Sequence, residues 1–289
     1  MYNDITIIIV CYKSYDLIKK NLKVLKFFKT IIIDNSNCER TYNLVKYIDN
    51  IRFINTLKNL GYGQANNLGV SNAHTKFILI LNPDIMVDEE SILALYNKKN
   101  LYDNIGILVP SLFSQANERK TNGSKSYFKK IFNKEFIKNI NFAEGDTCYD
   151  YAIGCAFFMD REFFNKIGGF DKDFFMYFED NEICDRVYKY NKTVIETPSS
   201  KMIHMEGMSS EKSFMSNSKL SIIHKISEFI YINKNLSKLK LYTNLTIQLI
   251  DYIQRMIFSF FTFKFKKSFK NLLRIFSILL YITSLYKLI

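Results

Sequence analysis

Short β-branched runs alternate with segments of helical period over the first 110 residues, and no other feature restricts the fold of this chain as strongly. Strands that alternate with helices of about 10–15 residues form a parallel sheet covered by helices. The sequence therefore predicts an α/β fold with a Rossmann-like, mostly parallel sheet. The runs with the length of buried strands are Ile5–Val10, Thr30–Ile33, Ile51–Asn55, Phe77–Leu81 and Ile105–Val109. The segments with helical spacing are 14–28, 38–48, 64–73 and 89–98.

Polar residues follow three of these runs directly. They form the clusters Cys11–Ser14, Asp34–Ser36 and Asn82–Asp84. In sheets of this kind, ligands bind in the crevice at the carboxyl ends of the strands. We therefore expect the three clusters to line one crevice. Residues 111–150 have weak periodicity and many Lys, Asn and Ser residues, and we expect them to form an insertion beside that crevice.

The composition of the chain changes near residue 210. All ten glycines and all three prolines lie at or before Gly207. The formal net charge is +12, and residues 212–289 carry 13 basic residues with Glu228 and Asp251 as their only acids. Loss of turn-forming residues together with a change in charge indicates a domain boundary. We expect one domain at 1–212 and a basic, aromatic-rich helical region at 213–289.

Several classes of protein do not fit the pattern. Five cysteines without a Cys-x-x-Cys pair fit neither a disulfide framework nor a cysteine zinc site, and they favour a reducing compartment. We expect no signal peptide, and no membrane-spanning helix because no run reaches about 18 uncharged apolar residues. The loop at Gly61 and Gly63 has Asn66 in place of the third glycine of a dinucleotide fingerprint and follows the third strand, so an NAD site is not expected.

Three positions are candidates for chemistry. Asp84, at the end of its strand, suits a divalent cation that bridges phosphate oxygens, or else it caps the helix that follows. Asp180 lies at the start of a helix, where an acid either complements the helix dipole or acts as a general base. His204 follows the strand-like run Thr193–Glu196 and Pro198, and a lone histidine is more often structural than a ligand.

A series of short motifs runs in a fixed order through the first 204 residues. They are Ile9–Ser14, Asp34–Ser36, Asn59–Gly63, Asn66–Gly69, Leu81–Asp84, Gly154–Phe158, Gly168–Phe175, Tyr177–Asp180 with Cys184 and Arg186, and Ile203–His204. Together they resemble family 2 glycosyltransferases of the GT-A fold, near the bacterial rhamnosyltransferase-like members, over about residues 4–230. The resemblance implies a glycosyltransferase of the hexosyltransferase type.

The resemblance implies a nucleotide-diphosphate sugar as the donor. It places Cys11, Asp34, Asn66, Asn82 and Asp84 among the donor-binding residues, with Asp34 at the base and Asn66 near the ribose or the diphosphate. The implied donor is dTDP-linked or UDP-linked, and rhamnose is the first sugar to try. Another hexose or galactofuranose is the alternative.

The resemblance also implies a metal site and a catalytic base. Asp84 matches the second, metal-binding acid of the family's Asp-x-Asp motif, whereas Asn82 departs from the first. His204 matches a histidine that completes the metal shell in some relatives, so Asp84 and His204 would hold Mn²⁺ or Mg²⁺. Asp180 matches the catalytic base. Glu182 stands where many relatives have Asp, which leaves its role open.

The implied reaction is an inverting transfer of the sugar to a lipid-linked or surface glycan acceptor in bacterial polysaccharide or O-antigen synthesis. One carboxylate that deprotonates the acceptor and one cation on the diphosphate suffice for such a displacement. A second hypothesis is a membrane-associated scaffold with a catalytically decayed GT-A fold, because Asn82 and Glu182 depart from the family pattern.

The C-terminal region is expected to form two or three helices with apolar residues at spacings of three and four. Lys264, Lys266, Lys267, Lys270 and Arg274 lie among its aromatic residues. Basic and exposed aromatic residues together indicate an interfacial helix on an anionic membrane, which predicts a cytoplasmic protein held peripherally on the inner face of the cell membrane. The alternative is a helical hairpin packed on the catalytic domain. Nucleic acid is not an expected partner, because no recognised nucleic-acid module accompanies the region.

Overall fold

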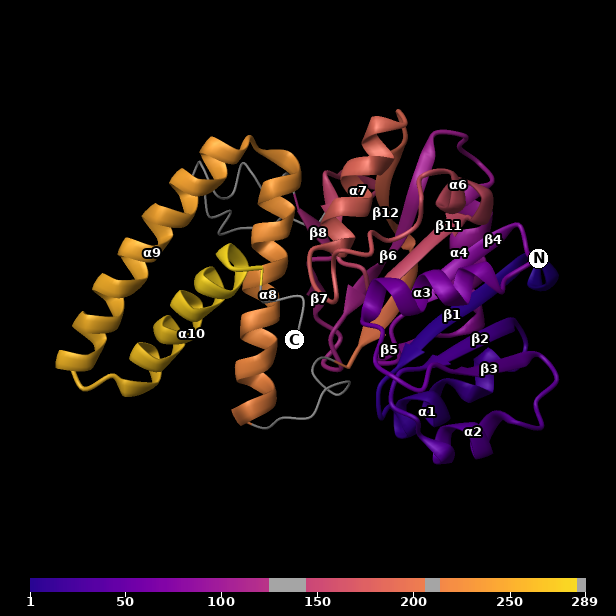
Figure 1. Cartoon of the computed structure of the whole chain (residues 1–289). Helices are drawn as coiled ribbons and strands as arrows, with labels where there is room; N and C mark the ends of the chain where they lie inside the picture. Colours follow the sequence, from indigo (N-terminus) through magenta and orange to yellow (C-terminus); the bar gives the residue numbers. More distant parts are fainter. Residues whose placement is uncertain (125–143, 206–213, 285–289) are drawn as a thin grey trace. The chain divides into compact units, whose positions relative to one another are not determined.

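The computed structural model describes residues 1–124, 144–205 and 214–284 (Figure 1). Among these residues, no helix is both long and apolar enough to cross a membrane. The domain boundary predicted at 212–213 lies outside the described residues, as do residues 125–143 of the insertion predicted at 111–150.

The chain forms two compact units. Met1–Lys172 and Glu179–Ser210 make up the first, which we call the sheet unit. Asp173–Phe178 and Glu211–Ile289 make up the second, which we call the helical unit. The short segment 173–178 therefore leaves the sheet unit to join the helices, and nothing in the composition of the chain signals this.

The first half of the sheet follows the predicted alternation. β1 to β4 are parallel and lie in the order β3-β2-β1-β4. Their β-branched side chains are restricted at χ1 and pack well in a sheet that is buried on both faces. The strands are Ile5–Cys11 (β1), Lys29–Asp34 (β2), Ile51–Asn55 (β3) and Phe77–Leu81 (β4). A 3-10 turn at Tyr2–Asp4 (η1) precedes them, and the helices between them are Tyr15–Leu25 (α1), Glu39–Val45 (α2) and Tyr62–Ser71 (α3).

The second half of the sheet departs from simple alternation. β11 lies between β4 and β6 and is antiparallel to both, so the sheet is mostly but not wholly parallel. β12 runs parallel to β6, and β5 pairs with the end of β12. These elements are Ile85–Met86 (β5), Glu89–Lys99 (α4), Ile105–Phe113 (β6), Ala156–Asp160 (β11), Arg161–Lys166 (α6), Glu179–Lys189 (α7) and Thr193–His204 (β12).

β12 continues well beyond the strand predicted at 193–196. Its ladder with β6 shifts register between Thr197 and Lys201, so the chain passes Pro198 without a continuous ladder. β6 also runs to Phe113, so the predicted insertion begins later than expected. The described part of that insertion contains Arg119–Lys120 (β7), Gly123–Ser124 (β8) and Thr147–Tyr149 (β9), followed by Tyr151–Ala152 (β10).

Helices cover both faces of the sheet (Figure 1). Alternate residues of β1 enter two separate apolar cores, with Ile7 in one and Ile8 in the other. Helices α1, α2 and α4 pack on the first face, and α3, α6 and α7 pack on the second. Gly69 of α3 permits a close approach, because a Cβ atom there would overlap Cγ2 of Ile8. The predicted α/β fold with a helix-covered sheet is confirmed.

Three helices follow in the helical unit, where the sequence predicted two or three. They are Phe214–Asn235 (α8), Lys238–Phe261 (α9) and Phe265–Ile282 (α10). Ser237 caps α9 by accepting a hydrogen bond from the backbone N–H of Lys240. Phe229, Leu245 and Ile278 are buried and contribute one side chain from each helix to the core of this unit.

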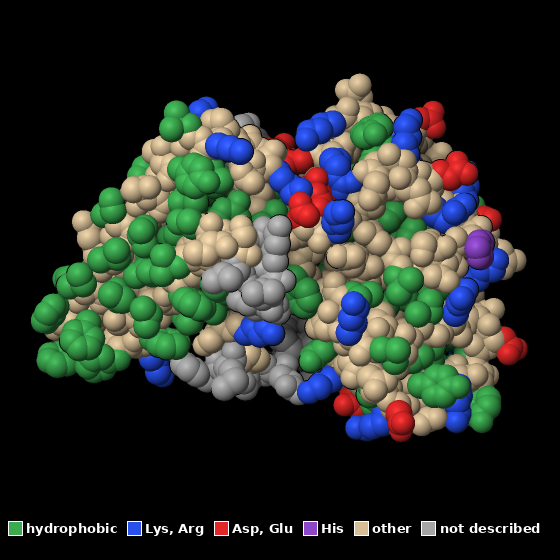
Figure 2. Space-filling view, viewed as in Figure 1, with side chains coloured by type: hydrophobic (Ala, Val, Ile, Leu, Met, Phe, Trp, Pro, Cys, Tyr) green, Lys and Arg blue, Asp and Glu red, His purple; other side chains and the backbone are tan. Residues whose placement is uncertain are grey.

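Helices α9 and α10 expose much of their apolar surface. Their outward side chains recur at spacings of three and four, as along one side of a helix, and they form what we call the outward stripe. Its members are Ile250, Ile253, Ile257 and Phe261 on α9, and Phe265, Phe269, Leu272, Phe276 and Leu279 on α10. Figure 2 shows hydrophobic side chains gathered over these two helices. Polar Ser259, Asn271 and Ser277 of the same helices are buried, so the inward side of this pair of helices contains polar as well as apolar residues.

Candidate functional site

The polar clusters that follow β1 and β2 lie side by side. Cys11 is the register partner of Asp34 in the parallel ladder. Beyond the strands, the backbone N–H of Lys13 donates a hydrogen bond to Oγ of Ser36 at 2.9 Å. β4 is the neighbour of β1 on its other side, so all three predicted clusters follow adjacent strands.

The carboxylate of Asp34 is fully buried and stabilises the loop that leads into α2. Its Oδ1 accepts hydrogen bonds from N and Oγ of Ser36, and its Oδ2 accepts one from N of Cys38 at 2.5 Å. Burial, and then the charge of Asp34, raise the pKa of the Cys11 thiol far above its ordinary value. Cys11 therefore stays protonated. Its thiol fills space at this end of the sheet and does not act as a nucleophile.

Asn66 of α3 is fully buried near the loop that precedes the helix. Its Nδ2 donates to the backbone carbonyl of Tyr62 at 3.0 Å, and its Oδ1 has no hydrogen-bond partner among the described residues. The loop itself is attached to the end of β2, because Nδ2 of Asn35 donates to the carbonyl of Gly61 at 3.1 Å. Gly61 has a φ of 79°, which a residue with a side chain rarely adopts.

The pairing of β5 with β12 brings Asp84 next to His204. His204 is the register partner of Ile85, and Nε2 of His204 lies 3.6 Å from Oδ2 of Asp84. The side chain of Asp84 is almost fully buried, whereas that of His204 is 22% exposed. The alternative that Asp84 caps the following helix is wrong, since Asp88 accepts the capping hydrogen bond from N of Ser91 at 2.7 Å.

Asn82 lies two residues before Asp84 and is fixed through its backbone. Its N–H donates to the carbonyl of Cys155 at 2.8 Å, and its buried Oδ1 has no hydrogen-bond partner among the described residues. Carboxylate, imidazole and amide oxygen are ligand types that suit Mn²⁺, and the first two lie close together in Asp84 and His204. Within 1–124, 144–205 and 214–284, no group of three or more His, Cys, Asp or Glu residues could hold a metal. A cation at this place would therefore need most of its ligands from a substrate or water.

Asp180 lies in the first turn of α7 and is held by Gly154. The N–H of Gly154 donates to Oδ2 of Asp180 at 3.1 Å, and the N–H of Asn181 lies 2.9 Å from Oδ1. The carbonyl of Gly154 accepts a hydrogen bond from the hydroxyl of Tyr62. A Cβ atom at residue 154 would lie 3.0 Å from Cβ of Asp180, so a larger residue there would press on Asp180 and require it to shift.

Burial raises the pKa of Asp180, while hydrogen bonds from backbone N–H groups partly offset this. Its neighbour Glu179 is buried, and burial followed by the charge of Asp180 raises the pKa of Glu179 well above its ordinary value. Oε2 of Glu179 has no hydrogen-bond partner among the described residues. A carboxylate with a raised pKa is a stronger base than an ordinary one, which suits proton abstraction.

The Gly154–Cys155 segment connects the two halves of the site. Burial raises the pKa of the Cys155 thiol first, and the charges of Asp84 and Asp180 raise it further. Both carboxylates therefore lie within electrostatic range of the same buried side chain. The structure thus gathers Asp84, His204 and Asp180 around one segment of chain. Asn66 lies on α3, whose Tyr62 bonds to that segment, whereas Asp34 ends β2, which β1 and β4 separate from β11.

Glu182 has a structural partner. Its two carboxylate oxygens accept hydrogen bonds from Nε and Nη2 of Arg186 at 2.8 and 2.6 Å. Nη2 of Arg186 also donates to the carbonyl of Gly169 at 2.5 Å. Glu182 and Arg186 therefore hold the Gly168–Gly169 turn, where both glycines have positive φ values.

Sequence reasoning missed Tyr62 and Glu179. Tyr62 is partly buried, and burial followed by the charge of Glu179 raises the pKa of its hydroxyl well above its ordinary value, so it remains a hydrogen-bond donor. The signal for Tyr62 was its position between Gly61 and Gly63, two glycines that allow close packing on both sides. A Cβ at Gly63 would lie 2.9 Å from Cβ of Phe170, which confirms that packing.

Two family models match the chain. The model described as glycosyl transferase family 2 matches residues 6–168, which is more than half of the chain. The model described as the N-terminal domain of galactosyltransferase matches residues 134–209, where Asp180 and His204 lie.

Three relatives each match about two thirds of this chain. The low-salt glycan biosynthesis hexosyltransferase Agl10 of Haloferax volcanii is 29% identical over 66% of this chain and 64% of its own length. The rhamnosyltransferase WbbL of Escherichia coli is 27% identical over 63% of this chain and 75% of its own length. The N-acetylglucosaminyl-diphospho-decaprenol L-rhamnosyltransferase of Mycobacterium tuberculosis is 23% identical over 70% of this chain and 73% of its own length. The chain thus spans less than two thirds of the haloarchaeal relative.

Solved structures share the fold at low sequence identity. GalNAc-T7 with UDP, GalNAc and Mn²⁺ superposes with a TM-score of 0.54 at 15% identity, over 80% of this chain and 50% of that one. The mannosyltransferase PcManGT of Pyrobaculum calidifontis with GDP-Man and Mn²⁺ gives 0.54 at 14% identity, over 80% and 64%. TarS of S. aureus in complex with UDP-GlcNAc gives 0.52 at 14% identity, over 82% and 69%.

Proposed function

The chain belongs to glycosyltransferase family 2 and has the predicted GT-A fold, and from this premise we propose that it transfers a sugar from a nucleotide-diphosphate donor to an acceptor hydroxyl with inversion at the anomeric carbon. The observation that carries the proposal is the placement of Asp180, whose carboxylate is held by the N–H of Gly154 at 3.1 Å and whose pKa burial raises. One such carboxylate is sufficient for a direct displacement, because the acceptor needs a single base.

Asp180 acts as that base. It accepts the proton of the acceptor hydroxyl while the hydroxyl oxygen attacks the anomeric carbon from the side opposite the diphosphate. The bond to the diphosphate breaks as the new glycosidic bond forms, and the anomeric configuration is inverted. The Gly154 N–H, positioned by Tyr62, keeps the carboxylate in one orientation throughout.

Asp84 and His204 are the residues that would hold a divalent cation, Mn²⁺ or Mg²⁺. When bound, the cation supplies Lewis-acid stabilisation of the negative charge that develops on the leaving diphosphate. The carboxylate and imidazole of this pair, 3.6 Å apart, fit the ligand preferences of Mn²⁺. Mn²⁺ in the structures of GalNAc-T7 and PcManGT, which share the fold, supports the assignment.

The donor nucleotide lies against the ends of β1 and β2 and the start of α3. Asp34 and Asn66 are its proposed contacts, and the buried side chain of Cys11 is proposed to form part of the wall of the donor site. The buried Oδ1 of Asn66, which lacks a hydrogen-bond partner among the described residues, can accept a hydrogen bond from the ribose. A dTDP-linked or UDP-linked donor is proposed, with rhamnose first because two relatives are rhamnosyltransferases, and another hexose or galactofuranose as alternatives.

The acceptor is proposed to be a lipid-linked or surface glycan, as in polysaccharide or O-antigen synthesis. The outward stripe of α9 and α10 and the basic composition of residues 212–289 fit an anionic membrane surface. A relative that acts on a diphospho-decaprenol acceptor supports this choice. The proposed location is the cytoplasmic face of the membrane, with the helical unit as the peripheral attachment.

A decayed scaffold has less support than an active transferase. That hypothesis depended on Asn82 and Glu182, and the two residues now have different explanations. Glu182 pairs with Arg186 and holds a turn, so its presence in place of Asp is a structural feature. Asn82 keeps an oxygen at the position of the missing acid, and Asp84 and His204 remain paired beside it.

Replacing Asp180 with Asn tests the proposal. Loss of a positioned general base lowers transfer by about 10²–10⁴-fold. We therefore expect D180N to lose transfer by this factor, measured with radiolabelled donor, while its affinity for the nucleotide diphosphate in calorimetry stays within about twofold of the wild type. The matched control is Asp185→Asn on the same helix, which should retain transfer. Wild-type activity in D180N, or a retained anomeric configuration of the product by NMR, contradicts the mechanism.

A further inference from the structure

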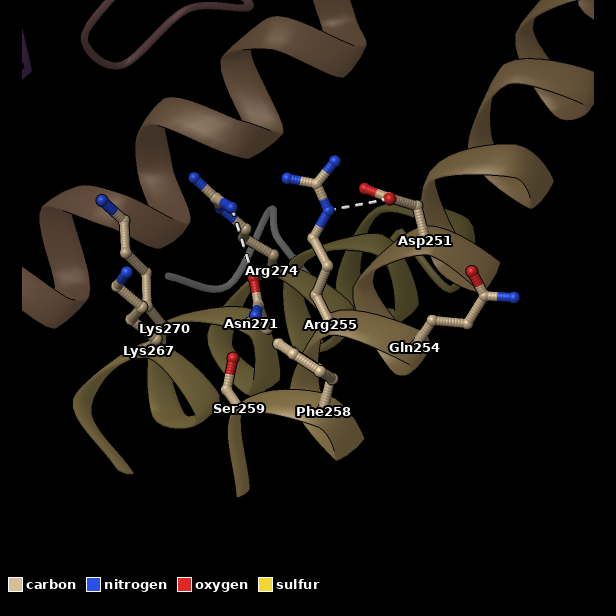
Figure 3. A pocket seen from close by; sticks show the side chains of 9 residues that line it. All are labelled: Asp251, Gln254, Arg255, Phe258, Ser259, Lys267, Lys270, Asn271 and Arg274. Carbon is tan, nitrogen blue, oxygen red and sulfur yellow. Dashed lines mark hydrogen bonds and ion pairs between the residues drawn. The ribbon is translucent and has the colours of Figure 1, made fainter. Parts of the chain in front are cut away.

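A hollow of about 490 Å³ lies between α9 and α10 of the helical unit (Figure 3). Volumes of about 300–1,000 Å³ are usual for small-molecule sites. Four cations line it, Arg255 from α9 and Lys267, Lys270 and Arg274 from α10, together with one acid, Asp251. We infer that this hollow, which we call the basic pocket, binds a phosphate monoester or a diphosphate group.

Most of the positive charge of the basic pocket is not neutralised by the protein. Asp251 pairs with Arg255, whose Nε lies 2.8 Å from Oδ1 of the carboxylate. In the part of the chain that the structure describes, neither Lys267 nor Lys270 has a carboxylate within ion-pair distance. Figure 3 shows these two lysines next to each other, projecting to the same side of α10 as Arg274. An anion bound between these two lysines would therefore pair with cations that have no carboxylate partner among the described residues.

Arg274 is oriented by two neutral neighbours. Its Nη1 donates to Oδ1 of Asn271 at 3.3 Å, and its guanidinium carbon lies 5.2 Å from the centre of the Tyr252 ring. Neither neighbour removes its charge, so its planar group of donors remains suited to phosphate oxygens. Buried Asn271 and Ser259 add an amide and a hydroxyl to the same wall. The pocket thus offers both charge and directed hydrogen bonds.

The three cations on α10 are close enough to repel one another, and a bound anion would relieve this repulsion. Lys267, Lys270 and Arg274 follow one another at three and four residues, so their side chains are neighbours on one side of the helix. Like charges at these spacings repel and destabilise a helix. A diphosphate, with several negative oxygens on a short bridge, can contact all three cations at once.

The basic pocket is distinct from the outward stripe. A helix turns by about 100° per residue, so Lys267, Lys270 and Arg274 lie on the side of α10 opposite Phe265 and Phe276. One side of the helix therefore presents apolar side chains and the other side presents the anion site. The inference does not depend on glycosyl transfer or on the proposed membrane contact.

Calorimetric titration of the full-length protein with inorganic pyrophosphate in EDTA tests the inference. EDTA excludes metal-dependent binding at Asp84 and His204. We expect saturable binding that Lys267→Gln combined with Lys270→Gln weakens at least about tenfold. The matched control, Lys264→Gln with Lys266→Gln, removes the same charge from the start of the same helix at residues that do not line the pocket, and it should change binding less than about twofold.

The outcomes separate a built site from diffuse charge. No saturable binding by the wild type overturns the inference. Equal weakening in the two double variants also overturns it, because that result indicates general attraction of polyanions such as duplex DNA. Vesicles that contain phosphatidic acid identify the source of the phosphate. Competition by pyrophosphate against vesicle binding assigns the pocket to a lipid headgroup, whereas pyrophosphate binding without such competition assigns it to a free phosphate compound.

Discussion

The sheet unit and the helical unit differ in how much apolar surface they expose. In the sheet unit, Ile7 and Phe158 are fully buried and polar residues gather where the strands end. In the helical unit, Phe261 is 74% exposed while Ser277 is fully buried. A unit that depends only on its own core places apolar surface inside, because burial is the main driving force of folding. Large exposed apolar patches often mark sites of interaction, which is the basis for the membrane contact proposed for the helical unit.

The two units also differ in where their functional charged side chains lie. The candidate residues of the sheet unit are buried or partly buried, and burial raises the pKa of Asp180 and Glu179 there. The helical unit displays its charges, since Lys267 and Lys270 are exposed at the edge of an open hollow. Buried carboxylates suit a reaction, whereas exposed cations suit recognition of an anionic group.

Replacing one phenylalanine with alanine in each unit measures how much a buried and an exposed ring contribute to the free energy of unfolding. Phe158→Ala removes a buried ring from the centre of the sheet and should cost about 3–5 kcal/mol of unfolding free energy. Phe261→Ala removes an exposed ring and should change that free energy by no more than about 0.5 kcal/mol. Urea denaturation followed by circular dichroism gives both values.

Vesicle binding completes this test. Phe261→Ala should weaken sedimentation with anionic vesicles, because it removes an aromatic ring from the outward stripe. The control is Tyr47→Ala, which removes an exposed aromatic ring from the sheet unit and should leave sedimentation unchanged. If Phe261→Ala destabilises the protein as strongly as Phe158→Ala, or leaves vesicle binding intact, the outward stripe is not a membrane surface.

A smaller effect is expected from pH at Glu179. The folded-state pKa of Glu179 lies well above the ordinary value of 4.5, so the folded protein binds this proton more tightly than the unfolded chain does. Stability from this group is therefore fully present below the ordinary value and is lost as the pH rises toward the folded-state pKa. Glu179→Gln has no carboxyl group to titrate at this position, so the variant should not lose this stability as the pH rises. Between pH 5 and pH 8, melting temperatures should fall by about 2–4 °C less in Glu179→Gln than in the wild type, as about 1 kcal/mol gives in a domain of this size.

The same melting series has a control on the same helix. Glu182→Gln changes a carboxylate that is paired with Arg186, and it should lower stability without flattening the pH dependence. Parallel curves for the wild type and Glu179→Gln would show that the buried carboxyl of Glu179 does not titrate differently in the two states.

Local sequence pattern was sufficient for the parts of the fold that depend on local physics. β1, β2 and β4 have largely continuous β-branched or apolar runs, and all four strands match their predicted ranges closely. The antiparallel insertion of β11 between β4 and β6 could not be predicted, because the choice of neighbour depends on contacts between distant segments. The extent of β12 was missed since Pro198 interrupts the hydrogen-bond ladder without ending the strand.

The candidate site, like the fold, could be predicted only in part from the sequence. The motifs pointed to Asp84, His204 and Asp180, and the structure places Asp84 beside His204 through the pairing of β5 with β12. The fixing of Asp180 was not visible, because it depends on the bond from Tyr62 to Gly154, which joins residues 92 positions apart. Nothing in the sequence indicated that both carboxylate oxygens of Asp34 accept hydrogen bonds from its own loop.

Thermal unfolding with nucleotide diphosphates, with and without Mn²⁺, tests the central claim that the Asp84–His204 pair forms the donor site. A ligand at a hundredfold its dissociation constant adds about 2.7 kcal/mol of stability. We predict that UDP or dTDP stabilises the wild type only when Mn²⁺ is present, and that Asp84→Asn abolishes this shift. An unchanged metal-dependent shift in Asp84→Asn, or no shift of the wild type with any nucleotide, would contradict the account.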